Sequence, residues 1–200
     1  MKNIEPFIKI VCEGDKTEPN YFNNLLRAKG FKLPNPASKP KDHSPKGVAR
    51  EAKKWYKDAL KLGIPKNQIH VWAVFDRDGH AGIPEAFDQL RQFPIGIAFS
   101  NICFEFWILL HYQRTSMQFH NCDEVVKFIQ ENHDKNYGKA NDHYNRLQDR
   151  IPAAIEHAKW LTDTYWAFDD RQIWERNPYT DVYKIIQGID DIIRNNDPEI

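Results

Sequence analysis

Three acidic residues follow two apolar segments of the sequence, at positions where carboxylates could hold a metal ion. Glu13 comes directly after Phe7 to Cys12 (FIKIVC), and Asp76 and Asp78 follow Gln68 to Phe75 (QIHVWAVF). In an extended chain the two aspartates point the same way, because side chains two residues apart share a face. Carboxylates that share a small volume raise each other's pKa, and a hard dication with oxygen ligands removes that repulsion. The pattern predicts a Mg²⁺ site on these three acids, with Mn²⁺ as a substitute.

The same acids could instead be ordinary solvent-exposed turn residues. A single acid after a strand is typical of a solvated turn, and a lone Asp-x-Asp is more often such a turn than a metal site. Glu-Gly after one buried strand together with Asp-x-Asp-Gly after another is more specific. Gly14 and Gly79 would let the backbone turn sharply, so that a ligand could approach closely.

A fourth acid, Glu105, lies in a segment that is apolar on nearly every side, Asn101 to Tyr112 (NICFEFWILLHY). Such a pattern is typical of a helix that is buried all round. A buried carboxylate needs a partner. Glu105 could therefore bind or orient a metal, or it could be a first-turn acid stabilised by the helix N-terminus. Both interpretations remain open at this point.

Four further residues are candidates for contacts with the substrate. Ser100 and Asn101 are ordinary capping types, and they also sit at the end of an expected strand, where phosphate oxygens can be bound. His111 ends the same helix, although a single histidine there is more often a structural residue than a base. Lys139, in the loop KNYGKAND, is a phosphate binder only if the second half of the chain folds back.

The elements that must position these residues alternate between strand and helix. The clearest strands are the two already given and a third from Ile95 to Phe99. Helices are expected from a Thr17 cap to Gly30, from Ser44-Pro45 to Gly63, and from Pro84 to Gln92. The order predicts an α/β fold with a mostly parallel sheet flanked by helices. Ligands of such sheets sit beyond the carboxyl ends of the strands.

The second half of the chain has a different pattern. We expect helices over Asp123 to Gln130, Ile151 to Leu161 and Thr180 to Ile193, with no strand of comparable strength. The expected organisation is a catalytic core over residues 1–113 and a helical region over residues 114–200 that packs on the core.

Composition excludes several classes of protein. The 200 residues carry no net charge, but residues 27–66 contain 12 Lys/Arg and 3 Asp/Glu, so that segment is strongly basic. A basic segment beside an acidic body is consistent with contact to a phosphate backbone, and equally with a solvated lysine-rich helix and loop. The sequence has no GxSxG elbow, no P-loop and no Cys/His metal motif. With no apolar stretch of membrane-spanning length and three cysteines that fit reduced thiols better than disulfides or zinc, a cytoplasmic protein is expected.

Three segments resemble the RloB-like proteins, a family with a Toprim-like core found near bacterial restriction and phage-defence genes. They are IVCEGDKTEPNYF, VWAVFDRDGH and AFSNICFEFWILLHY, with weaker matches at NYGKAND and NPYTDVYKIIQGI. In Toprim domains a Glu after the first strand and a later DxD bind Mg²⁺, which implies Glu13 and the pair Asp76 and Asp78. Glu105 matches the acid of the family's S-N-x-x-F-E-x-W segment. Ile102 stands where the family often has proline, which should alter the turn only modestly.

The resemblance implies a metal-dependent nuclease that cleaves DNA or RNA, with tRNA as one option, in restriction-linked or abortive-infection defence. Glu13, Asp76, Asp78 and Glu105 would be the catalytic acids, with Glu13 as the general acid or base. The alternative is a Mg²⁺-dependent module that binds a nucleotide or nucleic acid while a partner protein does the chemistry. A homo-oligomer is a further expectation. Fold similarity does not establish the reaction.

Overall fold

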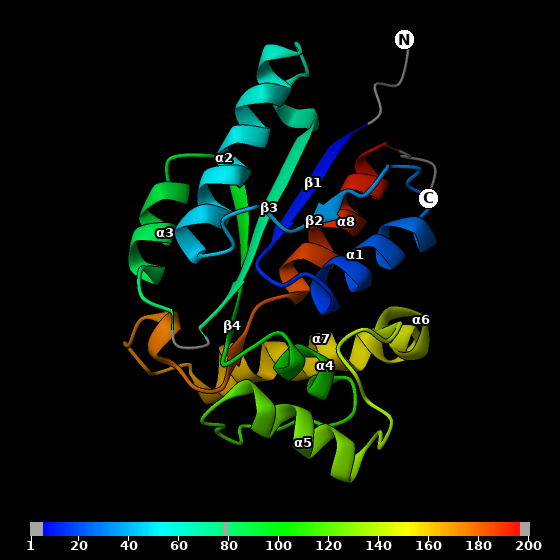
Figure 1. Ribbon diagram of the computed structural model, residues 1–200, viewed down its shortest axis with the longest axis vertical. Coiled ribbons are helices and arrows are strands. Elements are labelled where there is room, and N and C mark those ends of the chain that lie inside the picture. Colours follow the sequence, from blue (N-terminus) through cyan, green and yellow to red (C-terminus); the bar gives the residue numbers. More distant parts are fainter. Residues whose placement is uncertain (1–5, 78–79, 197–200) are drawn as a thin grey trace.

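A five-stranded sheet forms the centre of the protein (Figure 1). The computed structural model describes residues 6–77 and 80–196. The strands are β1 (Phe7–Cys12), β2 (Ala37–Ser38), β3 (Ile69–Asp76), β4 (Ile95–Asn101) and β5 (Tyr179–Thr180). They lie in the order β2-β1-β3-β4-β5, with β1 to β4 parallel and β5 antiparallel to β4. The α/β class and the mostly parallel sheet are therefore confirmed.

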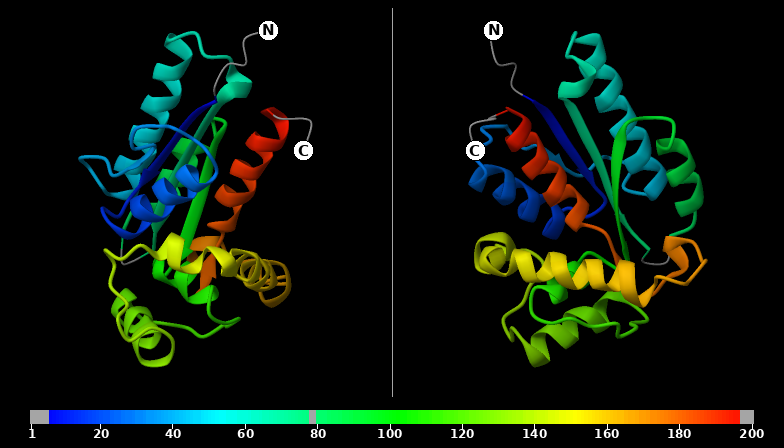
Figure 2. Two further views of the ribbon diagram at one scale, coloured as in Figure 1. Left: turned by 90° about the vertical axis from the view of Figure 1, so that its right-hand side faces the viewer. Right: turned by 180° about the vertical axis from the view of Figure 1, so that it is seen from behind.

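Helices cover both faces of the sheet, with α2 and α3 on one side and α1 and α8 on the other (Figures 1 and 2). The α-helices are α1 (Thr17–Ala28), α2 (Pro45–Lys61), α3 (Ile83–Leu90), α4 (Glu105–Leu110), α5 (Cys122–Asn132), α6 (His143–Leu147), α7 (Ile151–Trp160) and α8 (Tyr183–Asn196). The expected Ser44 cap of α2 is confirmed, since its side chain accepts a hydrogen bond from the Gly47 N–H.

The helices α4 to α7 gather beyond the carboxyl ends of the strands (Figures 1 and 2). Both halves of the chain contribute to one hydrophobic core, as the fully buried residues Phe75, Trp107 and Ile189 illustrate. The second half thus folds over the edge of the sheet at which parallel strands bind their ligands. Within the part of the chain that the structure describes, no helix combines the length and the apolar character needed to cross a membrane.

The second half of the chain adds one short strand to the sheet. Tyr179 and Thr180 form β5, which pairs with Asn101 and Ser100 at the end of β4. The next residue, Asp181, is buried, and its carboxylate accepts a hydrogen bond from the Phe99 N–H over 2.7 Å. Because these contacts hold residues 179–181 extended against β4, α8 begins at Tyr183 rather than at Thr180. The same pairing keeps Asn101 in the sheet, so the apolar helix α4 begins only at Glu105.

Two further expectations about local structure also fail. Thr17 lies inside α1 instead of capping it, because its hydroxyl lies 3.0 Å from Oε1 of Glu105. The cysteines are not all reduced, since Cys103 and Cys122 form a disulfide and Cys12 remains a buried free thiol. The spacing of 19 residues gives no sign of that pair, which forms because the fold places the start of α5 against the turn before α4.

Candidate acidic site

A cavity of about 250 Å³ opens where β1 and β3 end, between the sheet and the second half of the chain. Acidic side chains line it: Glu13, Asp15, Glu18, Asp76 and Glu105. We call this cavity the acidic pocket. The exposed Asp15 lies 4.0 Å from Lys39, whereas the other four carboxylates face one another's charges. Such a group of acids needs protons or cations to be stable.

Glu13 joins the ends of the two strands. Its Oε2 accepts a hydrogen bond from the Asp76 N–H over 3.0 Å, and its Oε1 lies 2.7 Å from Nε2 of His80. The parallel pairing of β1 with β3 brings the two acids together, as expected from the sequence. His80, the last residue of the VWAVFDRDGH segment, thus reaches the site through Glu13.

Among the described residues, Asp76 has one carboxylate oxygen with a hydrogen-bond partner and one without. Its Oδ2 accepts a hydrogen bond from the Phe104 N–H over 3.1 Å. Its Oδ1 is buried and has no hydrogen-bond partner among residues 6–77 and 80–196. Burial raises the pKa of Asp76 well above its usual range, and the charges of Glu18, Glu13 and Glu105 raise the pKa further. A bare, buried carboxylate oxygen in this position is suited to a cation ligand.

Glu18 is a residue of the site that the sequence interpretation missed. Its side chain is buried, and Oε1 accepts a hydrogen bond from the Gly14 N–H over 3.1 Å. Burial, followed by the charge of Glu105, raises the pKa of Glu18 to about 7. A Cβ on residue 14 would fall on the Glu18 carboxylate, so Gly14 is needed for this close approach. An acid in the first turn of the helix after Glu13-Gly14 was the available signal.

Glu105 closes the pocket from the side of α4. It is 3% exposed, and its Oε1 lies 3.0 Å from the Thr17 hydroxyl and 3.8 Å from the Lys139 ammonium. The two open interpretations are compatible in this geometry. Glu105 stands in the first turn of α4 and also faces the acids at the ends of β1 and β3.

The other predicted residues divide into two groups. Lys139 lines the acidic pocket, because the second half of the chain does fold back over the sheet edge. Ser100 and His111 are buried with internal partners: the Ser100 hydroxyl lies 3.0 Å from that of Thr180, and His111 Nε2 lies 3.2 Å from the Tyr21 hydroxyl. Burial lowers the pKa of His111 to about 4. Asp78, with Gly79, lies outside the described residues.

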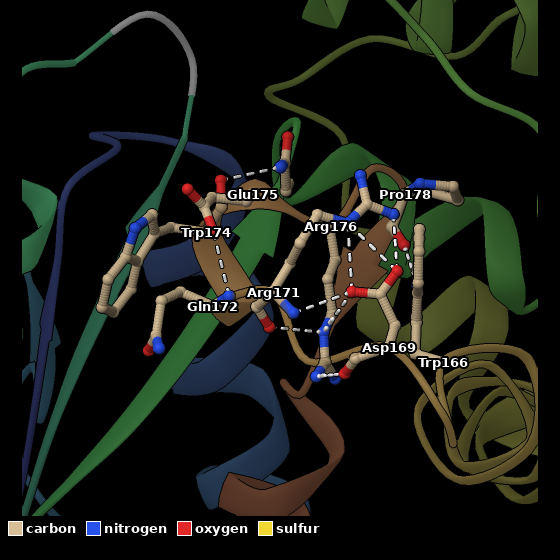
Figure 3. A network of polar contacts seen from close by, with 9 residues as sticks. Trp166, Asp169, Arg171, Gln172, Trp174, Glu175, Arg176 and Pro178 are labelled. Carbon is tan, nitrogen blue, oxygen red and sulfur yellow. Dashed lines mark hydrogen bonds and ion pairs between the residues drawn. The ribbon is translucent and has the colours of Figure 1, made fainter.

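Asn101 instead supports the loop that borders the site. Its Nδ2 donates to the Trp174 carbonyl over 3.1 Å, and Arg77 Nε donates to the same oxygen over 3.2 Å. Figure 3 shows how the segment around Trp174 is held by its own polar network, in which Arg171 and Arg176 converge on Asp169. This arrangement anchors Arg77, the residue directly after Asp76, to the loop around Trp174.

The residues present fit a hard divalent cation. Carboxylate oxygens line the pocket beside the sulfurs of Cys103 and Cys122, and one of these oxygens is buried without a partner among the described residues. Carboxylate oxygens are the ligands that Mg²⁺ and Mn²⁺ prefer. Basic residues line the same cavity: Lys16, Lys39, His43 and Lys139. An acidic centre flanked by lysines can hold a metal and a phosphate group side by side.

Comparison with known proteins gives one match. A family model described as RloB-like protein matches residues 8–189, which is most of the chain. No curated protein and no solved structure matches the chain significantly.

Proposed function

The chain belongs to the RloB-like family, and from this premise we propose that it is a metal-dependent nuclease that cleaves phosphodiester bonds of DNA or RNA. The proposed setting is the anti-phage defence that the family resemblance implies. The metal would be Mg²⁺, with Mn²⁺ as a substitute.

One observation carries the proposal. Asp76 keeps a buried carboxylate oxygen without a hydrogen-bond partner in the described parts of the chain, next to Glu13, Glu18 and Glu105. In the absence of a cation this arrangement is unfavourable, because four carboxylates repel one another in a poorly solvated space. A divalent cation would satisfy the bare oxygen and offset the repulsion. The acidic pocket is therefore best explained as a metal site.

Each residue would have a distinct part in the reaction. Asp76, Glu18 and Glu105 would hold the metal from β3, α1 and α4, and Asp78 is a further ligand that the family resemblance implies. A metal bound there would polarise the scissile phosphate and lower the pKa of the attacking water. Glu13, which contacts His80, would accept or donate the proton.

The lysines of the pocket indicate that the substrate carries phosphate groups. Lys16 and Lys139 come from opposite halves of the chain, and Lys39 belongs to the basic segment of residues 27–66. Ammonium groups beside a metal site attract and position phosphates. None of these contacts distinguishes deoxyribose from ribose, so DNA and RNA are both substrates to be tested.

The test is a cleavage assay with wild-type protein and the Asp76→Asn variant. Plasmid DNA, single-stranded DNA and total tRNA are each incubated with Mg²⁺, Mn²⁺ or EDTA. We expect metal-dependent cleavage by the wild type and none by the variant. The substrate that is cut decides between DNA and RNA.

A matched control is Asp88→Asn, an exposed acid of α3 that pairs with Arg91. This variant should cleave like the wild type. Cleavage retained by well-folded Asp76→Asn would disprove the assignment. Metal-dependent binding without cleavage under any condition would favour the alternative, a module that docks nucleic acid or a nucleotide for a partner enzyme.

A further inference from the structure

We propose that Cys103 and Cys122 form a reversible redox pair that controls metal binding in the acidic pocket. This inference concerns a modification site and rests on the proposed function only in that the pocket binds a metal. Both sulfurs line the cavity that holds Glu13 and Asp76. A change in the oxidation state of this pair therefore changes the lining of the acidic pocket directly.

The contacts of the disulfide concentrate on one carboxylate. Sγ of Cys122 lies 3.0 Å from Oε2 of Glu105, and the Lys139 ammonium lies 3.6 Å from the same sulfur. The bridge links the turn before α4 to the first residue of α5. Glu105 is only two residues beyond Cys103, so the bridge also fixes the segment that carries this acid.

A structural role for the bridge is not needed to explain the fold. Disulfides act as staples mainly in small domains that lack a sufficient core. This chain has an extensive hydrophobic core, to which the strands and the helices both contribute. Cys12, the third cysteine, is buried in β1 and unpaired. Only the two cysteines that touch the acidic pocket are bonded.

The reaction is a two-electron thiol–disulfide exchange with a dithiol as reductant. A thiolate of the dithiol attacks Sγ of Cys103, and Cys122 leaves as a thiolate beside the Lys139 ammonium, which stabilises that charge. The second thiol of the reductant then resolves the mixed disulfide and releases Cys103. The products are two cysteine thiols and an oxidised, cyclic disulfide of the reductant, so that two electrons and two protons have moved to the protein.

The oxidised and the reduced cysteine pair make different contacts with Glu105. The bridged sulfur carries no proton, so Oε2 of Glu105 receives no hydrogen bond from it and remains available to a cation. The reduced Cys122 thiol donates to that oxygen and competes with the metal. Reduction also releases the constraint between the turn that carries Glu105 and α5, and a less preorganised site binds more weakly. The oxidised state is therefore the one that binds metal more tightly.

The experiment compares Mn²⁺ affinity of the full chain before and after reduction. The protein is reduced with dithiothreitol, desalted without oxygen, and titrated by calorimetry beside the oxidised sample. Free thiols are counted in both samples by mass after alkylation of the unfolded chain. We expect one free thiol in the oxidised sample and three in the reduced sample. Mn²⁺ should bind about tenfold more weakly after reduction, because that factor corresponds to the free energy of about one hydrogen bond to a charged group.

Two variants serve as controls. Cys12→Ala should keep the full response, whereas Cys103→Ser/Cys122→Ser should bind like the reduced wild type under both conditions. Three free thiols in the air-oxidised protein, or equal Mn²⁺ affinity in the two states, would overturn the inference. Absence of Mn²⁺ binding in both states would overturn the metal site itself, and that result is separate from the thiol count.

Discussion

The carboxylate of Glu13, at the end of β1, accepts a hydrogen bond from the backbone N–H of Asp76, at the end of β3. The two residues are 63 positions apart, and the parallel pairing of Cys12 with Val74 sets their alignment. The strand that carries the second acid therefore also orients the first. This arrangement fixes the orientation of Glu13 through the backbone of the sheet.

The first prediction concerns the charge of Glu13. Glu13→Gln preserves an oxygen that can accept from the Asp76 N–H but removes one negative charge from the acidic pocket. We expect Mn²⁺ affinity to fall at least about tenfold while the melting temperature does not fall. Titration calorimetry and thermal unfolding measure the two effects. The exposed acid Glu131 supplies the control, and an equal loss of affinity in Glu131→Gln would contradict the prediction.

The second prediction concerns pH. Because burial raises the pKa of Glu18 from 4.5 to about 7, the folded protein keeps a proton at pH values where the unfolded chain has lost it. Stability from this group is thus fully present below pH 4.5 and is lost as the pH rises to 7. Between pH 5.5 and 7.5 the metal-free protein should lose roughly 2 kcal/mol in unfolding free energy from this source.

Denaturant unfolding of wild type and Glu18→Gln at the two pH values measures this loss. The variant cannot take up the proton and should show a smaller decrease. Mn²⁺ should restore the wild type at pH 7.5 by binding the ionised cluster. Identical pH dependence in the two proteins would show that Glu18 does not titrate as the burial and the neighbouring acids require.

The third prediction concerns contact with the nucleic-acid backbone. Lys139 lines the acidic pocket, whereas Lys135 of the same loop is exposed and is not among the residues that line this pocket. Lys139→Gln should weaken nucleic-acid binding and reduce the slope of log affinity against log salt by about 0.7 to 0.9. Fluorescence anisotropy across a salt series measures the slope. Lys135→Gln is the matched control, and equal changes in both variants would contradict a specific role for Lys139.

The fourth prediction separates a structural from a substrate-binding role for Asn101. Loss of its bond to the Trp174 carbonyl in Asn101→Ala should cost about 1–3 kcal/mol in unfolding free energy. Nucleic-acid affinity should remain within twofold of wild type. The exposed Asn132, which donates to the Phe128 carbonyl, is the control and should cost less than about 0.5 kcal/mol. A large loss of affinity at unchanged stability would instead restore Asn101 as a substrate contact.

The sequence predicts the sheet and the acids at its edge because both depend on local patterns. An apolar run such as Phe7–Cys12 identifies a buried strand directly, and parallel strands bring the residues that follow them to one edge. Glu13 and Asp76 follow from this rule alone. Lys139 could be only a conditional candidate, since its place depends on the path of the second half of the chain.

What the sequence did not predict depends on contacts made after folding. Glu18 is five residues from Glu13, but only the turn at Gly14 and the burial of α1 direct its carboxylate inwards. The two residues of β5 have no periodic pattern and become a strand because β4 offers an unpaired edge. The Cys103–Cys122 bridge likewise requires α4 and α5 to be in place.

The pairing of β5 with β4 has a consequence for synthesis of the protein. Residues 95–101 emerge from the ribosome about eighty positions before the Tyr179–Thr180 segment that protects their edge. During that interval the end of β4 exposes backbone groups that could pair with another chain. The hydroxyl of Thr17 also has partners that are made much later, since Glu105 and the carbonyl of Lys139 are 88 and 122 residues further along the chain. The acidic pocket therefore cannot be complete until Lys139, the last of its lining residues along the chain, has emerged.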